Sequence, residues 1–177
     1  MSEKILDNVE QRLRDVGVQA AWVQWSALGA GTVQKSRRAS SIIDPEALLL
    51  LSLYLIPAQR CLRDLTMWWA EVGSELLSVQ RTKTLAKDFP SATEERIRTY
   101  SRWATQAGDK RWRKYAEEET NAAHERDRKG PDEPKLRSPA SLLLRLRAGF
   151  GVSAKADVLA FLLGTAERSA TVKKAVE

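Results

Sequence analysis

The sequence has one cysteine and one histidine among 177 residues. One cysteine excludes a disulfide framework and a multi-cysteine zinc site, and one histidine excludes the histidine pair of a zinc hydrolase. The sequence also lacks a Gly-Lys-Ser/Thr phosphate loop. Gly29-Ala30-Gly31 is followed by Gln34 where a dinucleotide fingerprint has its third glycine. We therefore expect no catalytic residues, no metal and no other cofactor.

A long hydrophobic run is also missing. The longest apolar stretch, residues 47–56, has about half the length that a membrane-spanning helix needs. Residues 1–7 carry charges of both signs and lack the apolar core of a signal peptide. The sequence therefore predicts a cytoplasmic protein with no membrane partner. Free Cys61, in an apolar stretch, is predicted to be a small, inert core residue.

Positive charge exceeds negative charge. Lys and Arg number 29 against 23 Asp and Glu, which gives a net charge of +6. Such a surplus favours acidic partners, with nucleic acid as the first candidate. The composition is otherwise that of a globular protein, with 43% apolar and 29% charged residues, so the chain can bury a core.

The apolar residues follow helical spacing along most of the chain. Asp44-Pro45-Glu46 opens a helix whose body at 48–56 is apolar on all sides, so it is predicted to be the most buried element. Ser78 is predicted to cap a further helix, and Ser91 with Glu94 has the spacing of a capping box. The first helix, residues 2–28, is predicted to bury one face formed by Ile5, Val9, Leu13, Val16, Ala20 and Val23, widened by Val18, Trp22 and Trp25.

No alternating run is long enough to indicate a strand, so the predicted fold class is all-α. We expect a multi-helix bundle with helix-turn-helix-like elements and a C-terminal helical segment after a polar linker. In the linker the acids and bases cancel, and Leu136 is the only large apolar residue. The predicted parts are a helical body at 1–118, the linker at 119–137 and the C-terminal helices at 138–177.

Residues 78–89 are the most informative for function. On a helical wheel Gln80, Lys83, Thr84 and Lys87 gather opposite the apolar residues. Glutamine can hydrogen-bond adenine edges and lysine can contact guanine or phosphate, so this face suits the major groove of DNA. With the preceding helix, it gives a possible helix-turn-helix within residues 59–89. A solvated amphipathic helix would show the same pattern and remains the alternative.

A second basic segment lies at residues 110–115. Its aromatic members are Trp112 and Tyr115, and such a mixture is typical of phosphate contact combined with base stacking. The acidic residues 117–119 follow directly and weaken the local positive field, so a structural role is the alternative. The basic residues of the segment are Lys110, Arg111, Arg113 and Lys114.

Trp68 and Trp69 are adjacent, so one helix cannot direct both toward the same neighbour. If Trp69 joins the core, Trp68 is rotated by about 100°. Trp68 is therefore a candidate partner surface, unless another part of the chain covers it.

The C-terminal sequence carries a family resemblance. Residues 151–164, Gly-Val-Ser-Ala-Lys-Ala-Asp-Val-Leu-Ala-Phe-Leu-Leu-Gly, and residues 169–176, Ser-Ala-Thr-Val-Lys-Lys-Ala-Val, resemble the opening of winged helix-turn-helix domains in bacterial transcriptional regulators. The resemblance implies a helix, a short glycine turn and the start of a second helix. The sequence reaches Glu177 within that second helix, so none of the family's base-reading residues can be assigned here.

Together these features predict a non-enzymatic DNA-binding protein, a transcriptional regulator or a fragment of one. Its helical body would form a homodimer, bind a helical protein partner or sense a signal. The alternative is a protein-interaction module, such as an adaptor or an antitoxin-like partner, that makes no contact with nucleic acid.

Overall fold

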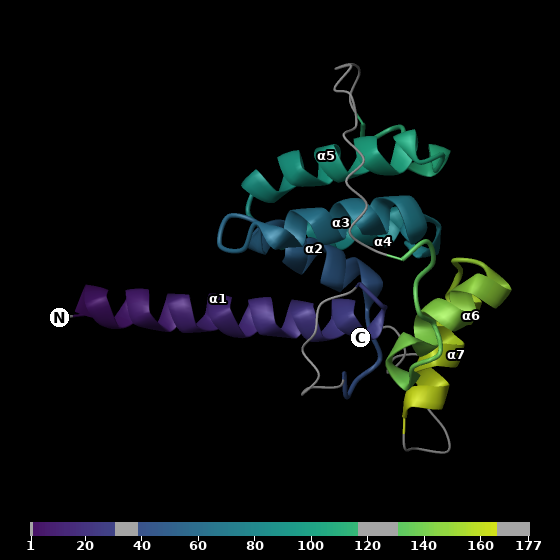
Figure 1. Cartoon of the computed structure of the whole chain (residues 1–177), viewed down its shortest axis with the longest axis horizontal. Helices are drawn as coiled ribbons and strands as arrows, with labels where there is room; N and C mark the ends of the chain where they lie inside the picture. The colour runs from purple at the N-terminus through teal and green to yellow at the C-terminus, as the bar shows by residue number, and fades with distance from the viewer. Residues whose placement is uncertain (1, 31–38, 117–130, 166–177) are drawn as a thin grey trace.

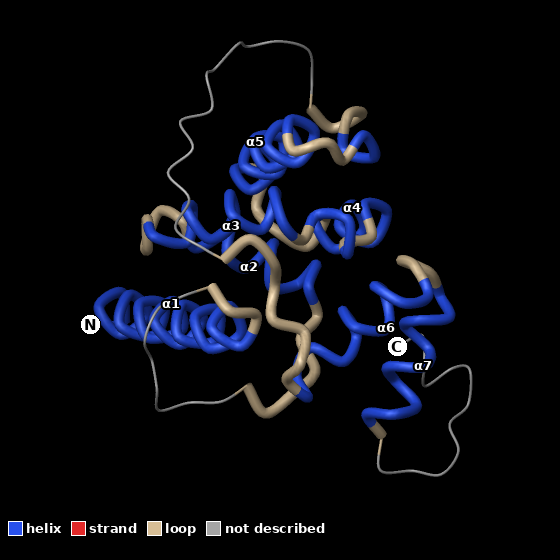
Figure 2. The backbone as a smooth tube through the Cα atoms, turned by 45° about the vertical axis from the view of Figure 1, so that its right-hand side comes forward, coloured by secondary structure: helices blue, strands red, loops and turns tan. Residues whose placement is uncertain are grey.

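A computed structural model of the chain describes residues 2–30, 39–116 and 131–165, with the backbone alone for residues 2–4. These residues form helices and loops only, as Figure 2 shows, which confirms the all-α class for the described chain. None of the described helices is both long and apolar enough to cross a membrane. The α-helices are α1 Ser2–Ala27, α2 Pro45–Leu55, α3 Cys61–Val72, α4 Val79–Ala86, α5 Ala92–Gln106, α6 Leu142–Phe150 and α7 Ala154–Gly164, with short 3-10 helices η1 Ser74–Leu76, η2 Lys110–Trp112 and η3 Pro139–Ser141 (Figure 1).

The core is built around α2, as its sequence predicts. Asp44 caps α2 by accepting a hydrogen bond from the Ala47 backbone N–H at 3.1 Å, and Pro45 occupies its first turn. α1, α3, α4 and α5 all pack against this helix, and in Figure 1 it lies in the middle of the body. Its side chains are therefore covered on several sides, and the fully or almost fully buried leucines are Leu48, Leu49, Leu50, Leu53 and Leu55.

α1 packs on this core with a different face from the predicted one. Ala21 and Trp25 are fully buried, and Gly17 lies so close to α2 that an added Cβ would meet the Leu55 side chain at 3.2 Å. In contrast, the large apolar residues between Ile5 and Val16 are 49–67% exposed. Ala20, on the same predicted face, is exposed too, and Val23 is only half-buried. The predicted buried face is therefore wrong, because helical spacing shows which side chains align and not which neighbour covers them.

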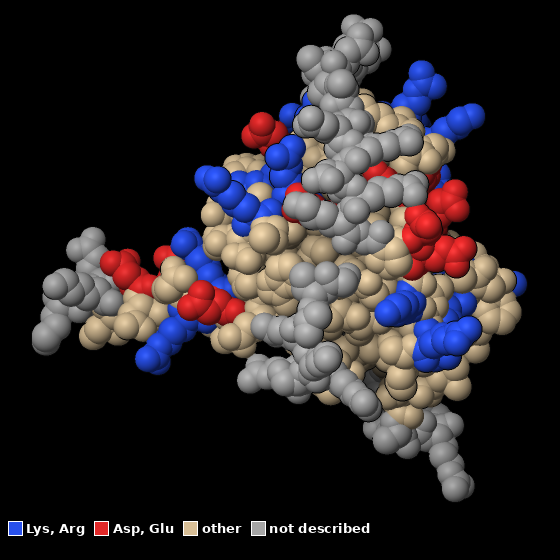
Figure 3. Space-filling view, in the orientation of Figure 1, with Lys and Arg blue, Asp and Glu red and all other residues tan. Residues whose placement is uncertain are grey.

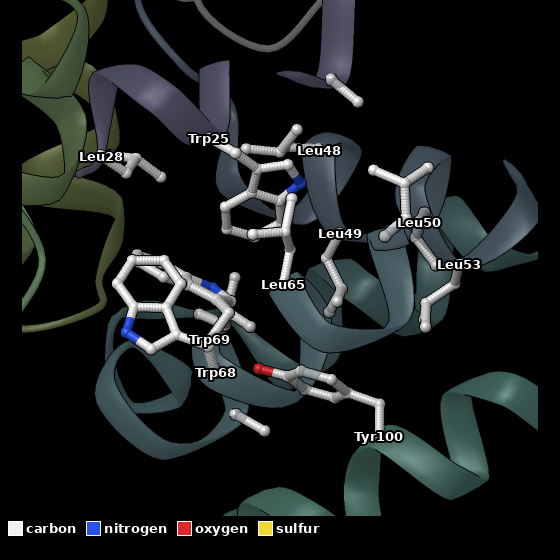
Figure 4. Close-up of a cluster of buried hydrophobic side chains, with 14 of the residues drawn as sticks. Trp25, Leu28, Leu48, Leu49, Leu50, Leu53, Leu65, Trp68, Trp69 and Tyr100 are labelled. Carbon is white, nitrogen blue, oxygen red and sulfur yellow. The ribbon is translucent and has the colours of Figure 1, made fainter. Parts of the chain in front are cut away.

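Three tryptophans join α1 to α3 (Figure 4). The Trp25 ring contacts the rings of Trp68 and Trp69 edge to face, with centroids 6.2 and 5.5 Å apart, and Trp25 Nε1 donates to Ser52 Oγ at 2.9 Å. Trp68 Nε1 donates to the Pro131 carbonyl oxygen at 2.7 Å, and only 6% of Trp68 is exposed. Trp68 is therefore covered by its own chain and offers no surface to a partner.

Two local predictions are wrong. Cys61 is the first residue of α3 and is exposed, so it is not a core residue. Ser91 has helical backbone angles and its side chain makes no capping hydrogen bond, so no capping box forms. Instead the Thr93 and Glu94 backbone N–H groups donate to the carbonyl oxygens of Pro90 and Ser91, which start α5 as a continuous turn.

The described end of the predicted linker lies on the helical body. The Lys135 backbone N–H donates to the Leu28 carbonyl oxygen at 2.7 Å, and the Lys135 side chain passes over Gly29. Gly29 has a φ of +91°, which a residue with a side chain rarely adopts, so glycine suits both its backbone and this close approach. Residues 119–130 of the linker lie outside the described residues, and the division into domains stays a prediction.

A buried ion pair joins α6 to α2. Arg147 Nη1 lies 2.5 Å from Glu46 Oε1, and neither side chain is exposed. Arg147 also donates to the Leu76 carbonyl oxygen at 3.0 Å and to Asp157 Oδ1 on α7 at 3.0 Å. Burial raises the pKa of Glu46, against the lowering effect of Arg147. Burial is the largest single influence on Arg147 and would lower its pKa, but the hydrogen bonds and negative charges of Glu46 and Asp157 together outweigh burial and raise the pKa of the guanidinium.

We predict that Arg147→Met lowers the free energy of unfolding by about 3–5 kcal/mol, because it leaves the Glu46 carboxylate buried without its main partner. The measurement is urea denaturation at neutral pH. Arg145→Met on the same helix is the matched control, since Arg145 is exposed, and it is expected to stay within about 0.5 kcal/mol of the wild type. Equal small losses in the two variants would show that the ion pair does not hold α6 in place.

Candidate nucleic-acid interface

α4 is anchored at its start by the acidic end of α2. The Ser78 side chain caps α4 by accepting from the Arg81 backbone N–H at 3.2 Å, as predicted. The Ser78 backbone N–H donates to Glu46 Oε1 at 2.6 Å, and Arg81 pairs with Asp44 at 2.5 Å. These bonds fix which side of α4 faces solvent. The four predicted DNA-facing residues, all of them exposed, are Gln80, Lys83, Thr84 and Lys87.

The second basic segment is anchored by Asp109. This carboxylate accepts from the Arg111 backbone N–H at 3.1 Å and from the Arg111 guanidinium at 2.7 and 2.9 Å. The same guanidinium donates to the Ser74 carbonyl oxygen at 2.9 Å. Trp112 is fully buried, with its ring 5.1 Å from that of Tyr100. The segment that follows is therefore fixed beside α4.

A groove of about 390 Å³ forms between α4, α5 and this segment. The Lys83 ammonium lies 4.4 Å from the centroid of the Tyr115 ring, within the range of a cation–π contact. Buried Ile97 contributes to the apolar floor. We call this the basic groove. Its lining residues are Lys83, Ala86, Lys87, Glu94, Ile97, Arg98, Lys114 and Tyr115.

The basic groove carries more positive than negative charge. Lys83, Lys87, Arg98 and Lys114 line it together with a single acid, Glu94. Burial raises the pKa of Tyr115, and the nearby Glu94 charge raises it further. The phenol is therefore neutral at physiological pH, and its hydroxyl group can donate a hydrogen bond to an anion. The groove has the chemistry of a phosphate-binding site, with an aromatic ring beside the charges.

The structure brings together only some of the predicted site residues. Lys83, Lys87 and Lys114 line the basic groove, whereas Gln80 and Thr84 are exposed on α4 outside its lining. The Thr84 hydroxyl donates to the Gln80 carbonyl oxygen at 3.2 Å. Of the basic cluster, Lys110 and Arg113 are exposed outside the groove, and Arg111 is committed to Asp109 and to the backbone.

Sequence reasoning missed Arg98 and Glu94, the α5 members of the groove. They are four residues apart, so they lie on one face of α5 one turn apart. A helical wheel of α5 could have placed them together on its exposed side. No local pattern indicates that this side faces Lys114, because that contact depends on how the chain turns after Gly108.

An acidic groove lies elsewhere on the surface. Glu71, Glu75 and Glu133 line it with Leu76 and Leu136, among other residues. In Figure 3 acidic side chains gather to the right of centre, below the Lys and Arg side chains that project beyond the end of α5.

The helix-turn-helix order is present, but no such motif is confirmed. α3, η1 and α4 follow one another as predicted. The Trp69 side chain lies against Gly73, where an added Cβ would come within 2.5 Å of the indole. The turn is therefore packed around a bulky ring. Of the segment that resembles a winged helix, residues 151–165 include α7, and residues 166–177 lie outside the described chain.

The chain matches no protein-family model, no curated protein and no solved structure with which it was compared.

We predict that Asp109→Asn destabilises the protein at neutral pH by about 1–3 kcal/mol, because the hydrogen bonds that Arg111 donates to a buried, charged acceptor weaken. Burial is the largest single influence on Asp109 and would raise its pKa, but the hydrogen bonds and positive charge of Arg111, together with a hydrogen bond from Ser74, outweigh burial and lower the pKa of Asp109. A lowered pKa contributes stability above the unfolded-state pKa of about 3.9, and this contribution is lost as the pH falls through the folded-state pKa.

The difference in unfolding free energy between wild type and Asp109→Asn should therefore be constant near neutral pH and shrink below about pH 4. Urea denaturation at several pH values measures it. Asp88→Asn, at an exposed aspartate just after α4, is the matched control and should show no such difference. A difference that stays constant down to acid pH would contradict the role given to the Asp109 charge.

Proposed function

We propose that the protein binds DNA without catalysing a reaction, and that it acts as a transcriptional regulator or as part of one. The observation that carries the proposal is the basic groove. Lys83 lies on α4, Lys87 caps its C-terminal end, and Lys114 comes from the segment after η2. The three lysines line one groove although Lys114 is far from the other two in sequence. Lysines brought together in this way provide a site for successive phosphates of a nucleic-acid backbone.

The exposed face of α4 is suited to recognise bases next to this phosphate contact. Gln80 lies on the exposed side of α4, about one turn before Lys83 and two turns before Lys87, and its amide is suited to adenine edges. Phosphate contacts fix the orientation of a protein on the duplex, whereas contacts to base edges give specificity. In this proposal the basic groove supplies affinity and Gln80 supplies sequence preference.

The basic segment contributes less than its composition suggests. Arg111 is held by Asp109 and by the Ser74 carbonyl oxygen, so it serves the fold. Arg111 contributes to binding only indirectly, because it helps to hold Lys114 and Tyr115 in place. The net charge of +6 adds a general attraction to DNA.

The proposal predicts that Lys83→Ala, Lys87→Ala and Lys114→Ala each lower the salt dependence of DNA binding. Each lost phosphate contact reduces the slope of log K against log salt by about 0.9. The measurement is titration of a labelled duplex by fluorescence anisotropy over a salt series, with thermal unfolding to show that each variant is folded.

The matched control is Lys155→Ala. Lys155 is an exposed lysine on α7, away from the basic groove, so the substitution removes the same charge. If Lys155→Ala lowers the slope as much as the groove variants do, the attraction comes from net charge alone. If a variant that combines Lys83→Ala, Lys87→Ala and Lys114→Ala binds duplex DNA at low salt with the affinity of the wild type, the proposal is wrong.

A further inference from the structure

α1 has a second apolar face that the body of the protein does not use. Leu6, Val9, Leu13, Val16, Ala20 and Val23 are spaced alternately by three and four residues, which is the heptad spacing of two helices packed along a seam. The large residues between Leu6 and Val16 are 49–67% exposed. We call these six residues the α1 seam.

The α1 seam is distinct from the face of α1 that packs on the body. The packing face, marked by Gly17, Ala21 and Trp25, is rotated from the seam by about 120° at 100° per residue. In Figure 1 the N-terminal half of α1 projects well beyond the rest of the body, and Figure 2 shows its outer side free of other described elements. A second helix can therefore lie along the seam without meeting the body of the same chain.

The parts of the chain outside the described residues hold little that could cover the seam. Besides Met1, these parts are residues 31–38, 117–130 and 166–177, which contain three valines, Val33, Val172 and Val176, and no larger aliphatic or aromatic residue. A seam of six apolar positions needs a comparable apolar row opposite it. Outside α1, the exposed large apolar residues of the described chain are Phe150, Val158, Leu162 and Leu163, which are fewer than the six positions of the seam. The best match to the α1 seam within this sequence is therefore the seam itself.

We infer that the α1 seam binds the α1 seam of a second copy of the chain, with the two helices antiparallel. In this arrangement Leu13 lies beside Val16 of the second copy, Val9 beside Ala20, and Leu6 beside Val23. Each larger residue of the exposed half then meets a smaller residue, whereas parallel helices would place Ala20 opposite Ala20 and leave a gap.

The charges beside the seam fit the same pairing. No charged residue lies on the seam between Leu6 and Val23. In the antiparallel register Arg12 lies beside Gln19 of the second copy, and Glu10 lies beside Gly17. Like charges therefore do not meet, and the two-fold symmetry of the pair is that of most homodimers.

This dimer goes beyond the proposed function and is tested without DNA. Sedimentation equilibrium over a range of protein concentrations measures the mass, and the wild type is expected to be a dimer. Leu13→Glu places a charge at the centre of the seam and should raise the dissociation constant by at least about tenfold. Leu13 is exposed in the single chain, so the variant should fold normally, which circular dichroism and thermal unfolding check at low concentration.

The matched control is Gln11→Glu. Gln11 is exposed on the side of α1 away from the seam, and the change introduces the same charge on the same turn. It should leave the dissociation constant unchanged. A wild type that is monomeric at all concentrations, or a Leu13→Glu variant that dimerises as the wild type does, would overturn the inference.

The orientation has its own measurement. A spin label on Lys4→Cys, with Cys61→Ser to remove the exposed native thiol, reports the distance between the two N-termini. The antiparallel pairing places residue 4 beside residue 25 of the second copy, so the labels lie about 31 Å apart along the helix axes at 1.5 Å per residue. Parallel helices would bring the labels to about the width of a helix pair, and such a short distance would overturn the antiparallel pairing.

Discussion

The structure depends on the buried pair of Glu46 and Arg147. A buried charge without a partner costs several kcal/mol, so the elements that carry and surround this pair have few alternative arrangements. The carboxylate on α2 accepts from Arg147 on α6 and from the Ser78 backbone N–H at the start of α4. Arg147 in turn donates to the Leu76 carbonyl oxygen and to Asp157 on α7. One ion pair thus fixes α6 and α7 against the body and sets the position at which α4 begins.

The position of α4 carries this constraint to the surface. Because Ser78 is held by Glu46, the rotation of α4 is fixed, and Lys83 and Lys87 face the segment that contains Lys114. On the other side, Arg111 bonds the carbonyl oxygens of Ser74 and Leu77, which belong to the same turn between α3 and α4. Both walls of the basic groove are therefore tied to one short stretch of backbone, and the groove is formed before any ligand binds.

Sequence reasoning succeeded where the signal is local. The caps at Asp44 and Ser78 depend on residues three positions apart, and the apolar body of α2 needs no specific neighbour to be recognised as core. Sequence reasoning failed where the residues that cover a side chain are distant in sequence. Trp68 is a candidate partner surface by its place on the helix, but Pro131 and Trp25 cover it. The basic groove, too, depends on contacts between residues that are distant in sequence. Two basic segments could be identified from the sequence, but their meeting depends on the turn at Gly108 and on the Asp109 cap, and no helical wheel contains that information.

The two apolar faces of α1 connect the fold to the proposed function. One face secures the helix to α2, and the other, the α1 seam, is suited to a second chain. Under the proposed function, a groove lined by three lysines would neutralise few phosphates, so a single copy would bind DNA only with the weak affinity of a non-specific contact at physiological salt. Two copies joined through α1 would carry two such grooves in a fixed relation, and binding of the second groove to DNA would be intramolecular once the first is bound. Dimerisation would raise the affinity for a duplex without any additional contact within each groove. In this proposal the α1 seam would therefore make a small basic groove sufficient for binding a duplex.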